Sequence, residues 1–153
     1  MWSFLRLRFA PPAALARSEE QAIGYLQDLY RIAYFLLGSR LGAEKLVQAA
    51  YQKVWRQHSR GERVGNWRLS LLQALLDVAK SPQFRGVEPG REEAPPLWEA
   101  LSRLDLGARA VILLDALDLP VKQIAWVVKA PETLTSQRLE AARDDFWNGC
   151  RDE

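Results

Sequence analysis

Cysteine and histidine, the residues that most often build metal sites, are nearly missing from the sequence. The chain of 153 residues has one cysteine, Cys150, and one histidine, His58. A single thiol cannot form an internal disulfide, and a structural metal site usually needs about four ligands close together. We therefore expect no metal site, no cofactor and a protein that works in a reducing compartment.

Long apolar runs are also missing. Arginines interrupt the apolar N-terminal segment, and Pro11 and Pro12 follow it, so the chain has no signal-peptide core of about 7–15 apolar residues. No segment approaches the roughly 18 uninterrupted apolar residues of a membrane span. We expect a cytoplasmic protein without membrane insertion, in which residues 1–17 form an N-terminal arm. A short amphipathic membrane anchor is the alternative for that arm.

The sequence motifs of common enzymes are absent as well. The chain has no glycine-rich phosphate loop, no Gly-x-Ser-x-Gly and no His-Glu-x-x-His motif. Acidic pairs such as Asp144-Asp145 stand at adjacent positions, whose side chains on a helix point about 100° apart and cannot converge on a substrate. The sequence therefore indicates that the protein is not an enzyme.

The charges that are present divide the chain into a basic front and an acidic rear. The composition, with 48% apolar and 26% charged residues, is that of a globular protein, and the net charge is only +2. Residues 1–17 and 18–81 carry +3 each, whereas residues 82–96 carry −1 and residues 97–153 carry −3. The near-neutral total argues against a strong polyanion binder, but the front half keeps a basic excess.

The front half predicts three amphipathic helices. Ser18-Glu19-Glu20-Gln21 has the spacing of a capping box, and the helix that it starts should end at Gly38. A second helix is expected from about Gly42, with an apolar stripe that Trp55 continues into the core. Asn66 can cap a third helix that runs to about residue 80.

The rear half predicts shorter helices after a linker. Residues 82–96 are rich in proline and glycine and show no helical period, which is typical of a linker. Helical stretches are then expected over residues 97–104, 107–117, 121–128 and 132–147. No alternating run bounded by hairpin turns predicts a strand. We therefore expect an all-α protein with two small helical domains, residues 18–81 and 97–153.

Residues 121–146 have the spacing of a helix-turn-helix. A short helix, a break around Lys129-Ala130-Pro131 and a longer helix follow one another. Small Ala125 allows the two helices to approach closely, and the expected shared core is formed by Ile124, Val128, Leu139 and Ala142. Taken alone, the pattern also fits an ordinary helical hairpin.

Several segments of the two halves can be compared together with a known family. In the front half they are Leu29–Gly38, Ala43–Gln48 and Val54–Arg56; in the rear half they are Leu104, Ala110–Leu114, Ile124-Ala125, Pro131, Arg138-Leu139 and Ala142-Arg143. In order and spacing the chain resembles the extracytoplasmic-function (ECF) class of bacterial RNA polymerase sigma factors, with similarity to region 2 in the front and region 4 in the rear. The resemblance covers about residues 20–146.

The resemblance implies a subunit of transcription initiation that binds core RNA polymerase and promoter DNA. Region 2 would dock on the polymerase and open the promoter −10 element, and region 4 would read the −35 element. By this resemblance, the polymerase-binding residues are Glu44, Lys45 and Gln48. The basic residues near the end of the first domain, which can neutralise the phosphates of a single strand, are Lys53, Arg56, Arg60, Arg63 and Arg68. The duplex-contacting residues of the helix-turn-helix would be Lys129, Thr133, Ser136, Gln137, Arg138, Glu140 and Arg143.

Departures from the family pattern keep alternatives open. Lys45 stands where the family commonly has an acidic residue, and Glu140 and Asp144-Asp145 place carboxylates on the expected recognition helix. The first hypothesis is a divergent ECF sigma factor. The second is a sigma-like protein that acts through protein contacts, as an adaptor or regulator of polymerase or of an anti-sigma protein, with weak or no promoter recognition. The third is a free-standing helix-turn-helix repressor or an unrelated helical enzyme.

Overall fold

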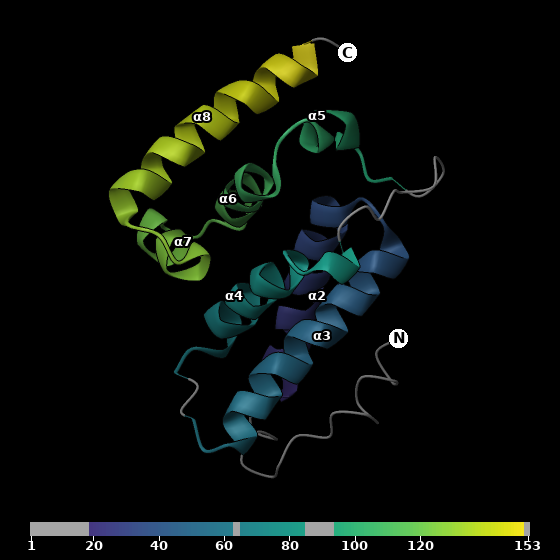
Figure 1. Cartoon of the computed structure of the whole chain (residues 1–153), viewed down its shortest axis with the longest axis vertical. Helices are drawn as coiled ribbons and strands as arrows, with labels where there is room; N and C mark the ends of the chain where they lie inside the picture. Colours follow the sequence, from purple (N-terminus) through teal and green to yellow (C-terminus); the bar gives the residue numbers. More distant parts are fainter. Residues whose placement is uncertain (1–18, 63–64, 85–93, 152–153) are drawn as a thin grey trace.

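The computed structural model describes residues 19–62, 65–84 and 94–151, and within these ranges every regular element is a helix. This confirms the all-α fold. The elements, shown in Figure 1, are α2 (Glu19–Leu37), α3 (Arg40–Ser59), α4 (Trp67–Ala79), the short 3-10 helix η2 (Pro82–Phe84), α5 (Trp98–Ser102), α6 (Leu106–Ala116), α7 (Val121–Val128) and α8 (Glu132–Arg151). None of the described helices is both long enough and apolar enough to cross a membrane.

Local signals set the helix boundaries in the front half. Helix α2 stops at Gly38, as expected, because this glycine takes a left-handed φ of +72°. Helix α3 begins at Arg40, earlier than the expected Gly42, because the Ser39 hydroxyl accepts a hydrogen bond from the Gly42 N–H at 3.1 Å and so caps the helix. The expected cap at Asn66 is confirmed: its Oδ1 accepts from the Leu69 N–H at 3.1 Å.

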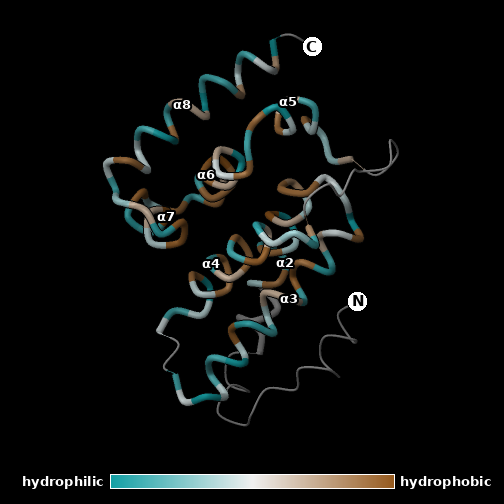
Figure 2. The backbone as a smooth tube through the Cα atoms, viewed as in Figure 1, coloured by the Kyte–Doolittle hydropathy of each residue, from teal (hydrophilic) through white to brown (hydrophobic). Residues whose placement is uncertain are grey.

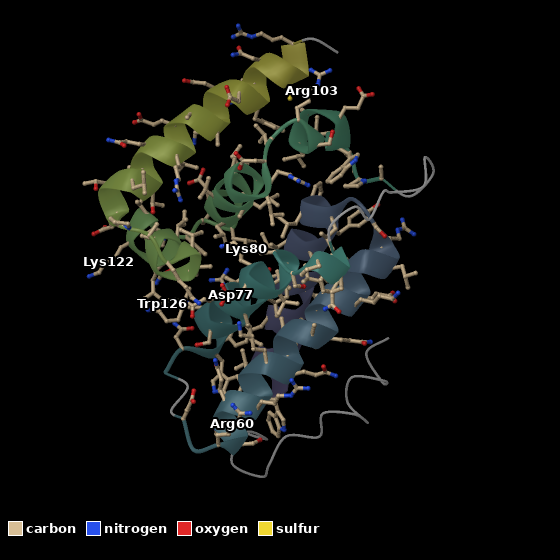
Figure 3. The ribbon with its side chains drawn as sticks, in the orientation of Figure 1. Arg60, Asp77, Lys80, Arg103, Lys122 and Trp126 are labelled. Carbon is tan, nitrogen blue, oxygen red and sulfur yellow. The ribbon has the colours of Figure 1, made fainter. Side chains whose placement is uncertain are left out.

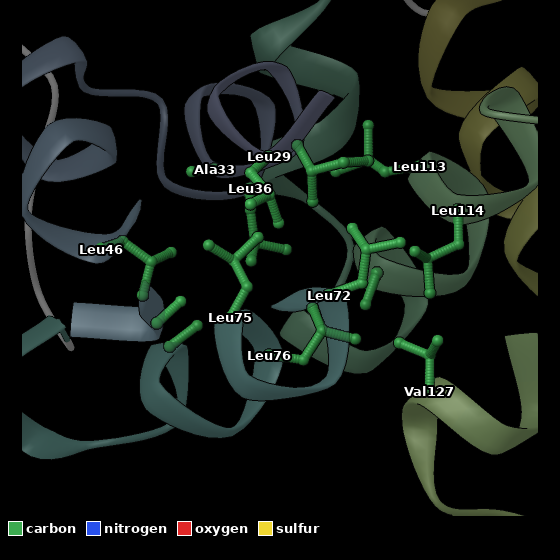
Figure 4. Packing of buried hydrophobic residues seen from close by; sticks show 14 of the residues in the cluster. Leu29, Ala33, Leu36, Leu46, Leu72, Leu75, Leu76, Leu113, Leu114 and Val127 are labelled. Atoms are coloured by element: carbon green, nitrogen blue, oxygen red, sulfur yellow. The ribbon is translucent and has the colours of Figure 1, made fainter. Parts of the chain in front are cut away.

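Helix α4 occupies the middle of the molecule. Its buried residues lie on more than one face: Leu71, Leu72, Ala74, Leu75, Leu76 and Ala79. Such a helix must be covered on several sides, and α4 packs against α2 and α3 of the front half and against α7 of the rear half. In Figure 4, Leu75 lies beside Leu46 of α3. Leu72 belongs to the same buried cluster as Leu114 of α6.

Part of the predicted linker, residues 82–96, is folded and packed against the rest of the molecule. Its first residues form η2, and Phe84 is buried in the core. Residues 85–93 lie outside the described residues. The chain enters the rear half at Leu97, whose φ is +62°, and α5 starts with Trp98.

The rear helices follow the predicted order with small shifts at their ends. Helix α7 has the predicted bounds, and α8 runs to Arg151, about one turn beyond the predicted end at residue 147. The extra turn is packed rather than free, because the buried Gly149 lies against Ala100 of α5. A Cβ on Gly149 would lie about 3.5 Å from the nearest Ala100 atoms.

One hydrophobic core joins the two halves. Buried residues from α2, α3 and α4 and buried residues from α6, α7 and α8 belong to the same cluster, and α2 packs against α6 as α4 does against α7. Figure 2 shows the hydrophobic positions gathered where these helices face each other, while α8 is largely hydrophilic along its length. The described helices therefore form a closed arrangement of the two predicted domains.

Candidate nucleic-acid interface

The helix-turn-helix is formed by α7 and α8. Lys129, at the turn, has a left-handed φ of +58°, and the Ala130 N–H donates to the Ala125 carbonyl at 3.0 Å. The Thr135 hydroxyl donates to the Pro131 carbonyl at 2.9 Å, which satisfies a polar side chain that is fully buried. Of the expected core residues, those that are buried are Ile124, Ala125, Leu139 and Ala142; Val128 is half-buried.

The expected base-contacting residues of α8 are accessible. Thr133, Gln137 and Glu140 are exposed and Ser136 is half-buried. Positions 133, 137, 140 and 144 are spaced by three or four residues and so follow one stripe of the helix. The second half of this stripe consists of Glu140 and Asp144, whose carboxylates repel a phosphate backbone.

Arg143, an expected phosphate contact, is paired inside the rear half. Its Nη2 lies 2.7 Å from Oδ2 of Asp115 on α6. Arg138 is exposed on α8. Helix α8 therefore exposes Arg138, whereas Arg143 would first have to leave Asp115 to contact a ligand.

Lys129 and Lys53, which come from opposite halves, share one carboxylate. Oδ2 of Asp77 on α4 lies 2.7 Å from Lys129 Nζ and 3.2 Å from Lys53 Nζ. Burial alone would raise the pKa of Asp77, but the hydrogen bonds from Lys129 and Lys53 outweigh it, so the pKa lies below its ordinary value. We call these three residues the Asp77 bridge. In Figure 3, Asp77 lies on α4 beside the helix-turn-helix.

A second hydrogen bond connects the same faces of α4 and α7. Gln73, one helical turn before Asp77, donates from Nε2 to the Trp126 carbonyl at 2.9 Å. This carbonyl lies in the last turn of α7, where it also accepts a 3.3 Å hydrogen bond from the Lys129 N–H. The face of α4 that carries Gln73 and Asp77 therefore holds both the C-terminal end of α7 and the turn that follows.

The expected single-strand contacts lie in different environments. Arg56 and Arg60 are exposed near the end of α3, and Arg63 lies outside the described residues. Arg68 is half-buried and its Nη2 lies 3.4 Å from Oδ2 of Asp28 on α2. Together with Lys53 in the Asp77 bridge, this leaves Arg56 and Arg60 as the described candidates that face solvent.

An aromatic cluster stands next to these arginines. The His58 ring lies 5.8 Å from the Trp55 ring and 5.5 Å from the Trp67 ring, between centroids. The expectation that Trp55 is a core residue was wrong: it is half-buried, because its ring packs on His58 at the end of α3. The three-residue spacing of Trp55 and His58 was a signal for one shared helix face that sequence reasoning did not use.

The expected polymerase-binding residues follow the start of α3. Lys45 is exposed, and Glu44 and Gln48, one helical turn apart, are half-buried. Burial raises the pKa of Tyr30 on α2, and the negative charge of Glu44 adds to the effect. Lys45 is therefore the most exposed charge of this patch.

A further contact between the halves was not predicted at all. Gly38 faces the Trp98 indole so closely that a Cβ on Gly38 would lie 2.5 Å from the ring. The guanidinium of Arg109 on α6 stacks 5.4 Å from the centre of the same indole, and its Nη1 donates to the Leu36 carbonyl. Burial lowers the pKa of Arg109 and Asp105 partly offsets this, yet an arginine stays charged at any physiological pH.

The fold resembles that of a solved structure. No family model and no curated protein matches the chain. The sigma factor RpoE from Bartonella quintana, solved in complex with the anti-sigma factor NepR, is similar with a TM-score of 0.67 at 18% sequence identity, over 87% of this chain and 96% of that one. The chain therefore has a sigma-factor-like fold that includes both halves.

Proposed function

We propose that the protein is an ECF-type sigma factor, which binds core RNA polymerase in the cytoplasm and directs it to promoters in transcription initiation. The observation that carries this proposal is the sigma-factor-like fold over 87% of the chain. A structural match of this extent covers both the three-helix front half and the helix-turn-helix of the rear half. The proposed function needs both parts.

The front half supplies the chemistry for single-stranded DNA. Arg56 and Arg60 are exposed and can neutralise phosphates. The half-buried rings of Trp55 and Trp67 on either side of His58 leave aromatic surface on which unpaired bases can stack. Charge and stacking surface are combined at one end of α3, as a single-strand site requires.

The rear half supplies weaker chemistry for duplex DNA. Thr133, Gln137 and Arg138 are exposed and available for base edges and phosphates, but Glu140 and Asp144 on the same helix oppose binding. We infer that most of the affinity for a promoter comes from polymerase and from the front half, with α8 adding discrimination.

Run-off transcription with purified core polymerase of the source cell tests the proposal. The wild-type protein should give promoter-specific product, and the double variant Arg56→Ala, Arg60→Ala should lose most of it. Arg31→Ala removes one positive charge at an exposed position on α2, so it is the control for each single substitution, Arg56→Ala and Arg60→Ala, and it should retain activity. A folded wild-type protein that yields no promoter-specific product would overturn the proposal.

A second candidate is a sigma-like protein that acts through protein contacts. The observation that favours it is the number of expected nucleic-acid contacts already held by carboxylates: Lys53 and Lys129 by Asp77, Arg68 by Asp28 and Arg143 by Asp115. In this closed form few basic groups remain for DNA. The partner would then be core polymerase or an anti-sigma type of protein, the kind of protein with which the similar RpoE chain was solved.

Two substitutions on α8 separate the candidates. If α8 faces DNA, Arg138→Ala should weaken DNA binding across sequences and Glu140→Lys should strengthen it, each removing or adding about one phosphate contact. The measurement is the salt dependence of binding to promoter DNA in the presence of polymerase. Unchanged binding in both variants, with retained binding to polymerase, favours the protein-contact candidate.

A further inference from the structure

The Asp77 bridge joins two lysines that the proposed function would use on DNA. Lys53 belongs to α3 and Lys129 to the turn of the helix-turn-helix, and both ammonium groups lie within 3.2 Å of the same oxygen of Asp77. The three charged groups thus connect the front half to the rear half. They also occupy, in the closed arrangement, one expected phosphate contact from each half.

We propose that the Asp77 bridge is an ionic latch that biases the chain toward the closed arrangement, and that nucleic-acid phosphates open it by competing with Asp77 for Lys129 and Lys53. The latch itself does not depend on the function proposed above; only the competition by nucleic acid rests on it.

The backbone of the turn places Lys129 for this contact. Its left-handed conformation follows directly on the last turn of α7, and its N–H donates to the carbonyls of Ala125 and Trp126. Gln73 holds the Trp126 carbonyl from the α4 side at 2.9 Å. The Lys129 side chain therefore starts from a fixed point beside α4, which lowers the entropic cost of its ion pair with Asp77.

Because the Asp77 bridge is exposed to solvent, it favours the closed arrangement only weakly and can be broken reversibly. The side chains of Lys129, Lys53 and Asp77 are 57%, 41% and 21% exposed, respectively. An exposed ion pair shifts an equilibrium by up to about fivefold and is screened by salt. Apolar residues of both halves are buried in one cluster, and α4 packs on α7 and α2 on α6. The bridge therefore adds a small contribution to that of the apolar contacts.

Phosphates are suited to displace Asp77. Asp77 offers a single carboxylate to both lysines, whereas a nucleic-acid strand offers a row of phosphates that can pair with Lys53, Lys129 and the exposed Arg56 at once. Each such contact also releases counterions from the nucleic acid. Binding of a polyanion should therefore favour the open arrangement by mass action.

Energy transfer between two dyes measures the opening. Exposed Gln27 on α2 and Asn148 on α8 accept the labels as Gln27→Cys and Asn148→Cys in a chain whose own thiol is removed by Cys150→Ser. Asp77→Asn should lower the transfer efficiency, with a shift of up to about fivefold in the ratio of open to closed molecules. Asp77→Lys should lower it further, because it places three cations together.

Two further variants decide between a latch and a general charge effect. Asp118→Asn removes the same charge at an exposed position between α6 and α7, and it should leave the transfer efficiency unchanged. The φ of +61° at this position is one that asparagine tolerates. Adding Lys129→Asp to Asp77→Lys restores an opposite-charge pair between the halves and should restore transfer. Equal transfer in the wild type, Asp77→Asn and Asp77→Lys, or failure of the reversed pair to restore it, would overturn the latch.

Binding of a random-sequence single-stranded DNA and of the corresponding duplex tests the competition. Asp77→Asn should bind both more tightly than Asp118→Asn, and either DNA should lower the transfer efficiency of the labelled wild type. If the variants open but DNA neither binds them more tightly nor opens the wild type, the competition is refuted while the latch stands. That result would also count against the proposed DNA-binding function. Normal run-off transcription, together with an Asp77→Asn variant that stays closed, would refute the latch alone.

Discussion

The three front helices and the helices of the rear half are stabilised in different ways. Helices α2, α3 and α4 have 19, 20 and 13 residues and pack closely on one another. In the rear half α5, α6 and α7 have 5, 11 and 8 residues, which is too short for stability in isolation. Helices α6 and α7 pack on α2 and α4 as well as on α8. The rear half therefore buries part of its apolar surface on the front half, and this shared core stabilises the closed arrangement.

The contacts across this boundary do not follow the net charges of the two halves. The front is basic and the rear acidic, so a general attraction would pair a front cation with a rear anion. In the Asp77 bridge the front instead contributes the anion, Asp77, and the rear the cation, Lys129. In another contact across the boundary, a rear cation, Arg109, donates to an uncharged front acceptor, the Leu36 carbonyl. Particular side-chain geometry, rather than overall charge, thus determines how the halves meet.

The largest effect is expected from a cavity at the boundary. Leu114 of α6 is fully buried and belongs to the hydrophobic cluster that the two halves share. Leu114→Ala should lower the free energy of unfolding by about 2–5 kcal/mol, the range found for buried leucines. Because the core is shared, calorimetry should still show a single transition, and hydrogen exchange should show both halves losing protection together. Selective loss of protection in the rear half, with the front half unaffected, would mean that the halves fold independently.

A smaller effect is expected where the front half meets Trp98. Gly38→Ala imposes a left-handed φ on an alanine and drives its Cβ into the indole, which lies 2.5 Å away. Gly61 has a similar φ of +83° but nothing within 4 Å of a Cβ, so Gly61→Ala measures the backbone strain alone. We expect a loss of about 1 kcal/mol for Gly61→Ala and about 3 kcal/mol for Gly38→Ala, from strain and overpacking. Equal losses of unfolding free energy for the two variants, measured by denaturant unfolding, would show that the Trp98 side chain moves aside at little cost and does not fix how the halves meet.

Most of the helices could be predicted because their signals are local. Asn66 is a strong cap, Gly38 is a strong stop, and the Pro131 break separates α7 from α8. The residues that stabilise each of these features are only a few positions apart, so the sequence alone contains the necessary information. The start of α3 was missed by two residues because Ser39 was not considered as a cap.

The meeting of the two halves could not be predicted in the same way. Asp77 pairs with residues 24 and 52 positions away, and Arg109 reaches a carbonyl 73 positions away. No spacing rule relates such residues, and each belongs to a type that is common on surfaces. One signal was available: the third helix carries leucines on more than one face, which indicates burial on several sides. The expected site residues on α3, α4 and α8 fall on helices that local signals predict, but their ion pairs with distant residues were not foreseen.

The smallest effect is the pH dependence of the Asp77 bridge. Although burial of Asp77 raises its pKa, the hydrogen bonds from Lys129 and Lys53 lower it further than burial raises it, so the pKa is lower in the folded protein than in the unfolded chain. Stability from such a carboxylate is fully present above the unfolded pKa of about 3.9 and is lost as the pH falls through the folded value. The difference in unfolding free energy between wild type and Asp77→Asn should therefore be constant from neutral pH down to about pH 5 and should vanish in stronger acid. Its size should stay below about 1 kcal/mol, because both lysines are exposed to solvent. Urea unfolding across this range checks the prediction, with Asp118→Asn as the charge-matched control. A difference that instead grows in acid would mean that Asp77 is destabilised by its surroundings, and that the apolar contacts hold the halves together without help from this bridge.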